Sequence, residues 1–130
     1  MDDLRFYRWL FYAAAAYNAV WGVVMVAMPN LAFDLLVMAR PNYPALWQCI
    51  GMMVGVFAIG YWLIAQDPVR YGPIAWIGLL GKVFGPIGLL MAALDGELPW
   101  SFGWICLTND VIWWIPFGLF LWRIRRTPAA

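Results

Sequence analysis

Four long apolar runs dominate the chain, and short polar stretches separate them. They cover residues 6–28, 44–65, 73–94 and 101–122. Each run is close to the ~20 residues that a helix needs to cross the hydrocarbon core of a bilayer. Because lipid cannot satisfy the hydrogen-bonding groups of an open strand edge, the runs predict helices rather than strands. We therefore expect an all-α integral membrane protein, a bundle of four transmembrane helices forming a single membrane domain over residues 1–130.

The segment between the first two runs, residues 30–43, is too short and too polar to span a bilayer. Its leucines favour a turn or two of helix lying in the headgroup layer, with Asp34 and Arg40 facing water. A simple interfacial loop with apolar anchors is the alternative.

Positive charge is distributed unevenly between the two ends of the predicted helices. Arginines lie near the N-terminus, in the loop after the second run and at the C-terminus, whereas the opposite loops hold Arg40 alone. Since the cytoplasmic loops of multi-pass proteins are enriched in Lys and Arg, we expect both termini to be cytoplasmic. This pattern predicts a multi-pass protein of the cell inner membrane, with the lipid bilayer as its main partner.

Composition agrees with a lipid environment. The chain is 65% hydrophobic and only 12% charged, whereas a soluble domain is about 25% charged. Its formal net charge of +1, with no basic run, argues against a nucleic-acid partner. The absence of histidine removes His-ligated haem, His-based metal sites and histidine-dependent catalytic triads, and we expect no metal and no cofactor.

Polar residues recur at the midpoints of three of the four runs. Asn18 lies at the middle of the first run, Lys82 at the middle of the third, and Asn109 and Asp110 flank the middle of the fourth. A charge at the bilayer centre costs about 2.5–3.5 kcal/mol on insertion scales, and such residues mark pathways or sites. The economical arrangement pairs Lys82 with Asp110 and lets the two asparagines add hydrogen bonds.

Helical spacing predicts which neighbours line this polar site. Trp21 shares a helix face with Asn18, Trp113 shares one with Asp110, and Gln48 begins the inward face of the second run. Aromatic walls with a few converging polar groups are typical of a small ligand pocket. For Asn18 and Gln48, hydrogen bonding that only holds helices together is the alternative. The expected ligand-binding residues are Lys82, Asp110, Asn109, Asn18, Gln48, Trp21 and Trp113.

Pro86 stands four residues after Lys82 in the third run. Proline has no N–H, so it cannot donate to the carbonyl four residues back, which belongs to Lys82. We expect a kink at this level and a free backbone acceptor that a neighbouring helix, a water or a ligand must satisfy. Pro116 removes the donor for the Ile112 carbonyl in the same way.

Cys49 and Cys106 each lie near the start of a run, two residues after a tryptophan. This repetition indicates a tandem repeat of two helical hairpins. A matched pair of this kind forms either a disulfide or a thiol redox couple. Packing as small buried apolar residues is the alternative, which we favour because free cysteine is among the most buried residue types.

The segments WQCIGMMVGVFAIGYW, GLLGKVFGPIG, GELPW and LTNDVIWWIPF resemble a family of small four-span bacterial membrane proteins. The resemblance covers nearly the whole chain and implies a four-span fold. Some members of that family carry the label alkyl hydroperoxide reductase. Applied to this chain, the label would assign redox chemistry to Cys49 and Cys106.

The leading functional hypothesis is binding or translocation of a lipid, another small amphipathic molecule or an ion at a mid-bilayer site built on Lys82 and Asp110. One alternative is an intramembrane enzyme acting on a lipidic substrate, with the same pair as acid and base. Another is a structural or assembly subunit in which the pair locks helices together. Stripes of small residues on the predicted helices allow close packing, either within one chain or between copies in a homo-oligomer.

Overall fold

The computed structural model describes residues 2–126, and over that range it contains helices and loops but no strand. Four helical segments are long and apolar enough to cross a membrane, by their length and composition. They are Leu4–Ala27, Pro44–Gln66, Ile74–Leu94 and Trp100–Ile124. The predicted all-α class with four apolar spans is thereby confirmed.

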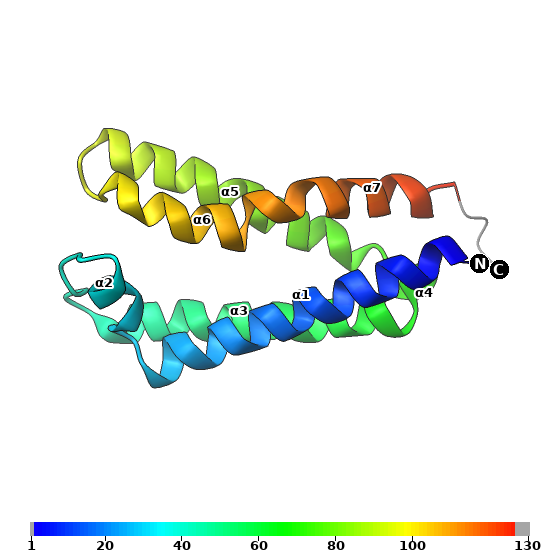
Figure 1. The fold of residues 1–130 in the computed structure, drawn as a ribbon, viewed down its shortest axis with the longest axis horizontal. Coiled ribbons are helices and arrows are strands. Elements are labelled where there is room, and N and C mark those ends of the chain that lie inside the picture. The colour runs from blue at the N-terminus through cyan, green and yellow to red at the C-terminus, as the bar shows by residue number, and fades with distance from the viewer. Residues whose placement is uncertain (1, 127–130) are drawn as a thin grey trace. The chain divides into compact units, whose positions relative to one another are not determined.

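The chain divides into two units that follow one another in sequence, Met1–Pro68 and Val69–Ala130. Each unit is a helical hairpin in which two long segments run antiparallel, side by side (Figure 1). The first hairpin contains α1 (Asp2–Ala27), α2 (Leu31–Leu35) and α3 (Pro44–Gln66). The short helix α4 (Pro68–Tyr71) stands at the join. The second hairpin contains α5 (Ile74–Leu94), the 3-10 helix η1 (Trp100–Phe102), α6 (Gly103–Asn109), the 3-10 helix η2 (Val111–Trp113) and α7 (Trp114–Ile124).

Glycine allows α1 and α3 to approach each other closely. A Cβ atom on Gly22 would lie 2.9 Å from the carbonyl oxygen of Gly51 and 3.0 Å from the nitrogen of Gly55. A Cβ atom on Gly51 would lie 2.6 Å from the Cβ atom of Met25. Membrane helices have no hydrophobic drive to associate, so close backbone contact of this kind supplies much of their packing energy. Small residues therefore form the centre of the first hairpin.

The segment between α1 and α3 contains one short helix, α2, and then a loop. Phe33 is buried and packs edge-on against Trp47, with ring centroids 5.0 Å apart. Arg40 donates two hydrogen bonds to the Asp34 carboxylate, at 2.8 and 2.9 Å, and both side chains are exposed. The structure therefore combines the two arrangements considered for residues 30–43, a single helical turn followed by a loop, with the charged pair facing outward.

The fourth apolar run is not one regular helix, contrary to the continuous helix that the sequence predicts for residues 101–122. Helix α6 ends at Asn109, and Asp110 leaves helical geometry with φ −122° and ψ −63°. The Thr108 hydroxyl donates back to the carbonyls of Trp104 and Ile105, at 3.0 and 3.2 Å, a contact that bends helices. Pro116 also lacks the N–H that would bond the preceding turn. These features break the segment near its middle.

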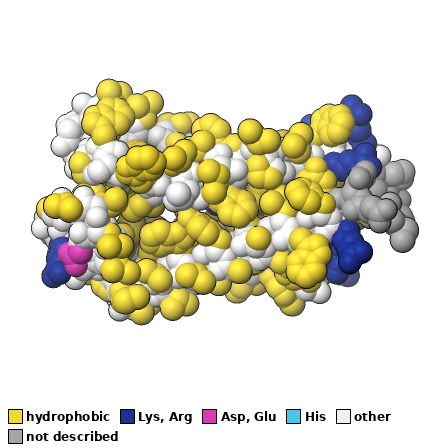
Figure 2. Space-filling view, viewed as in Figure 1, with side chains coloured by type: hydrophobic (Ala, Val, Ile, Leu, Met, Phe, Trp, Pro, Cys, Tyr) yellow, Lys and Arg dark blue, Asp and Glu magenta, His cyan; other side chains and the backbone are white. Residues whose placement is uncertain are grey.

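Large apolar side chains cover the outer faces of the helices (Figure 2). Phe84 is 64% exposed, Ile115 74% and Trp104 66%. Water would not tolerate so many exposed apolar groups, whereas lipid acyl chains would. Arginine side chains lie at helix ends, where Arg125 stacks over Trp76 at 4.9 Å and Arg126 over Trp122 at 3.9 Å. Such aromatic and basic groups fit the membrane interface.

Candidate polar site at the broken helix

Lys82 is the charged residue of helix α5, and it lies near the middle of that helix. Its side chain is only 4% exposed. Its ammonium nitrogen Nζ donates to the main-chain carbonyl oxygen of Asn109 at 2.6 Å. Asn109 is the last residue of α6, immediately before the break in the fourth run. The amine of one helix therefore meets the broken end of its neighbour.

The break leaves main-chain carbonyls at the end of α6 without their regular helical donors. In place of those donors, the indole N–H of Trp113 donates to the Thr108 carbonyl at 3.2 Å. The Lys82 ammonium serves the next carbonyl, that of Asn109. Irregular backbone inside a membrane is tolerated only where protein or water satisfies it. Side-chain donors within this hairpin fulfil that requirement.

A third carbonyl, that of Lys82 itself, lacks its helical donor because Pro86 has no N–H. The indole N–H of Trp114, the first residue of α7, donates to this oxygen at 2.9 Å. The prediction that Pro86 leaves an acceptor to be satisfied at the level of Lys82 is confirmed. The sequence allowed a neighbouring helix, a water or a ligand as the donor. In the structure the donor is a side chain of the neighbouring helix.

Asp110, the residue at the break after α6, is also buried and is 7% exposed. Its carboxylate accepts a hydrogen bond from the Asn109 side-chain amide, at 2.9 Å to Oδ1, and the Cys106 thiol lies close to it. The positive charge of Lys82 attracts it. Whereas the sequence favoured a direct pair, the Lys82 ammonium donates a hydrogen bond to the carbonyl of Asn109, the residue before Asp110. The two charges thus share a single cluster.

Gly85 makes room for the carboxylate. A Cβ atom on Gly85 would lie 2.8 Å from Oδ2 of Asp110, well inside van der Waals contact. Gly85 follows Lys82 by one turn of α5, so both residues face the break. The absence of a side chain at this position is what lets Asp110 reach the backbone of α5.

Trp113 forms an aromatic wall of this cluster. Its ring centroid lies 5.7 Å from the Lys82 ammonium, a cation–π distance, and 6.0 Å from the ring of Phe117. Four of the seven expected ligand-binding residues therefore lie together in the second hairpin. They are Lys82, Asn109, Asp110 and Trp113.

Asn18 and Gln48 belong to the first hairpin, where each bonds the backbone of the opposite helix. The side-chain amide of Asn18 donates to the Val54 carbonyl at 3.4 Å, and that of Gln48 donates to the Val26 carbonyl at 2.8 Å. These contacts agree with the alternative in which both residues hold helices together.

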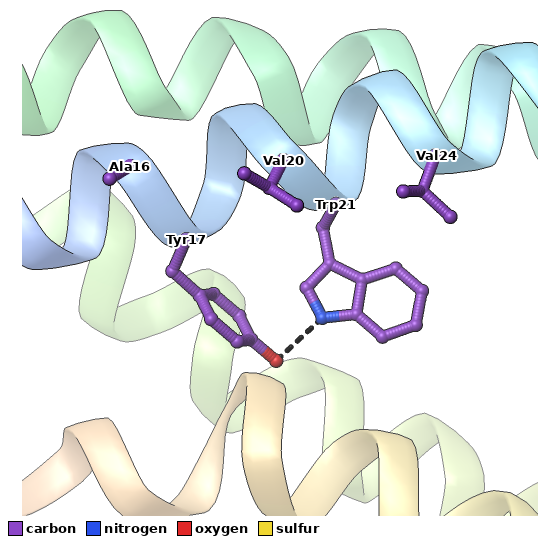
Figure 3. Close-up of a pocket in the computed structure, with 5 residues that line it drawn as sticks. All are labelled: Ala16, Tyr17, Val20, Trp21 and Val24. Atoms are coloured by element: carbon purple, nitrogen blue, oxygen red, sulfur yellow. Dashed lines mark hydrogen bonds between the residues drawn. The ribbon is translucent and has the colours of Figure 1, made fainter.

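Trp21, the remaining expected residue, donates from its indole N–H to the Tyr17 hydroxyl at 2.7 Å. Both rings face an apolar pocket of about 470 Å³ along α1 (Figure 3). Its other lining residues on that helix are Ala16, Val20 and Val24.

The two cysteines differ in their surroundings. Both are free thiols in the structure. Cys49 is exposed, whereas Cys106 is buried and lies close to Asp110. Sequence reasoning missed this link between Cys106 and the polar site, although the spacing of four residues along a helix placed the two on one face.

Comparison of the chain with protein families, with curated proteins and with solved structures finds no match.

Proposed function

We propose that this protein binds or translocates a small amphipathic molecule or an ion at the polar site of its second hairpin. The ammonium of Lys82 and the carboxylate of Asp110 form the core of that site. Asn109 fixes the orientation of the carboxylate, and Trp113 provides an apolar wall. The single observation that carries the proposal is the buried ammonium bonded to the broken end of a membrane-length helical segment.

Two physical arguments support this assignment over a purely structural pair. Ionisable residues within membrane segments are expensive, and they mark substrate or ion pathways by default. In addition, unwound backbone at mid-membrane is the feature by which many transporters coordinate substrates and ions. A structural lock needs the charge pair but does not need the helix to break beside it. The combination at Asn109 and Asp110 favours a binding site.

The proposed setting is a multi-pass protein of the inner membrane with both termini in the cytoplasm. The arginine distribution in the sequence supports that orientation. The order of two hairpins along the chain supports a tandem repeat, in which the second hairpin contains the helix break and the site.

Native mass spectrometry of gently extracted protein tests the proposal. We expect the wild-type chain to retain a small molecule and the variant Asp110→Asn to lose it while remaining folded. Asp34→Asn is the matched control, since it neutralises an exposed carboxylate outside the spans. If Asp110→Asn lowers the thermal stability but retains the same bound species as wild type, the pair is structural and the proposal is wrong.

A further inference from the structure

The surroundings of the Lys82 ammonium are those of a receptor for organic ammonium ions. A main-chain carbonyl accepts its hydrogen bond at 2.6 Å, and a buried carboxylate supplies the opposite charge. The face of Trp113 completes the set at 5.7 Å. Carbonyl, carboxylate and aromatic face are the three groups that proteins use to recognise alkylammonium ions. Lys82 itself is such an ion, attached to α5 by its own side chain.

The same geometry disfavours an anionic ligand. Asp110 is held at the site by the Asn109 amide, against the backbone at Gly85. An anion approaching Lys82 would meet this carboxylate in a poorly screened environment, where like charges repel strongly. The carbonyl oxygen of Asn109 adds further negative character. The fixed groups around the ammonium therefore select for positive charge.

We propose that the ligand of this site is an amphipathic organic ammonium ion, which takes the position of the Lys82 ammonium beside Asp110 and Asn109. This inference rests on the proposed function and names its substrate class. Lys82 acts as a tethered competitor that fills the site when no ligand is bound. A tethered group has a high effective concentration, so the native chain binds the ligand reversibly rather than trapping it.

Chemical replacement of the Lys82 side chain tests the recognition directly. In Lys82→Ala the missing atoms, Cγ to Nζ, correspond to n-propylammonium. We expect n-propylammonium to raise the thermal unfolding temperature of Lys82→Ala saturably by several degrees, and to leave wild type unchanged. Potassium at equal ionic strength should have no such effect. The double variant Lys82→Ala/Asp110→Asn should lose the response, because the carboxylate that recognises the amine is gone.

Lys82→Ala leaves a buried carboxylate uncompensated and is therefore prone to misfold. Extraction and size-exclusion chromatography with and without n-propylammonium cover that case. Recovery of monodisperse protein only when n-propylammonium is present supports the proposal. Failure of n-propylammonium to improve either recovery or unfolding temperature overturns it.

Amphiphiles that share one chain length and differ only in the head group test the substrate class separately from the proposed function. Wild-type protein in non-ionic detergent is mixed with n-decylammonium, decanoate or decanol, and bound adducts are measured by native mass spectrometry. We expect decylammonium to bind at least about tenfold more tightly than the other two, and more tightly still to Lys82→Ala. Preferential binding of decanoate, or equal binding of all three, contradicts the cationic ligand but leaves a binding function in place. Absence of any adduct, native or added, contradicts both.

Discussion

The indole N–H of Trp114 lies 2.9 Å from the main-chain carbonyl oxygen of Lys82. This contact joins two irregularities that lie far apart in the sequence. Pro86 removes the helical donor for that carbonyl in α5, and the break at Asp110 brings the start of α7 beside it. The donor that Pro86 removes from α5 is thus replaced by an indole N–H at the start of α7. The polar cluster forms where α5 meets the break in the fourth run.

Replacement of Trp114 by Phe should leave the Lys82 carbonyl without this donor. We expect a loss of about 0.5–2 kcal/mol in the free energy of unfolding, the range of hydrogen bonds between membrane helices. Thermal or denaturant unfolding in a defined detergent measures it. Pro86→Ala restores the backbone donor, so it should reduce the effect of Trp114→Phe in a double-mutant cycle. Equal losses in both backgrounds would show that the indole does not serve this carbonyl.

Gly85 and Gly88 of α5 offer a matched pair of substitutions. A Cβ atom on Gly85 would lie 2.8 Å from Asp110 Oδ2, whereas one on Gly88 would have no neighbour within 4 Å. We expect Gly85→Ala to displace the carboxylate, to cost about 1–3 kcal/mol of stability and to weaken ligand binding. Gly88→Ala should be neutral or slightly stabilising. Similar effects from the two variants, in unfolding and in native mass spectrometry, would contradict the placement of Asp110.

The first hairpin provides a second matched pair. The alanine methyl of Gly22→Ala would press on the backbone of Gly51 and Gly55, which cannot move aside as a flexible side chain does. We expect Gly22→Ala to destabilise the hairpin by about 1–3 kcal/mol. Gly55→Ala points its methyl into open space and should have little effect. The unfolding temperatures of the two variants test this prediction. A larger decrease for Gly55→Ala than for Gly22→Ala would place the α1–α3 interface elsewhere.

The exposed pair outside the spans should titrate in a predictable direction. The hydrogen bond from Arg40, aided by its charge, holds the pKa of Asp34 below its ordinary value of 3.8. Because the pKa is depressed in the folded chain, the pair stabilises the α2 segment above the ordinary carboxyl pKa. That contribution disappears as the pH falls through the folded value. NMR titration of the Asp34 carboxyl carbon measures the pKa, and Arg40→Gln should raise it toward the ordinary value. An unchanged pKa in that variant would exclude the pair in solution.

Much of the fold follows from patterns that the sequence displays directly. Apolar length predicts the four spans, and the position of Pro86 predicts a free carbonyl at Lys82. Such features depend on neighbouring residues in one segment. They are therefore visible without knowledge of the partner helix.

The break at Asp110 was not predicted, because the pattern of residues 101–122 satisfies helical spacing throughout. It depends on side-chain donors, namely the Lys82 ammonium on α5 and the indole of Trp113 in η2, which make irregular backbone tolerable in an apolar medium. The roles of Gly85 and Trp114 were missed for the same reason. A glycine in a glycine-rich helix and one tryptophan among ten carry no local signal of the contact they make.

The most direct test of the central claim is the distance between the Lys82 side-chain nitrogen and the Asn109 carbonyl group in lipid bilayers. Solid-state NMR of protein labelled with ¹⁵N at lysine Nζ and ¹³C at the asparagine carbonyl carbon measures the dipolar coupling between them. The chain has a single lysine, and substitution of Asn109 identifies the relevant asparagine signal. An N···O distance of 2.6 Å predicts strong dephasing of the Lys82 signal. This dephasing should disappear in a variant of Asn109 whose carbonyl at that position is unlabelled. In protein freed of any bound ligand, a lysine signal with no coupling to that carbonyl would contradict the account.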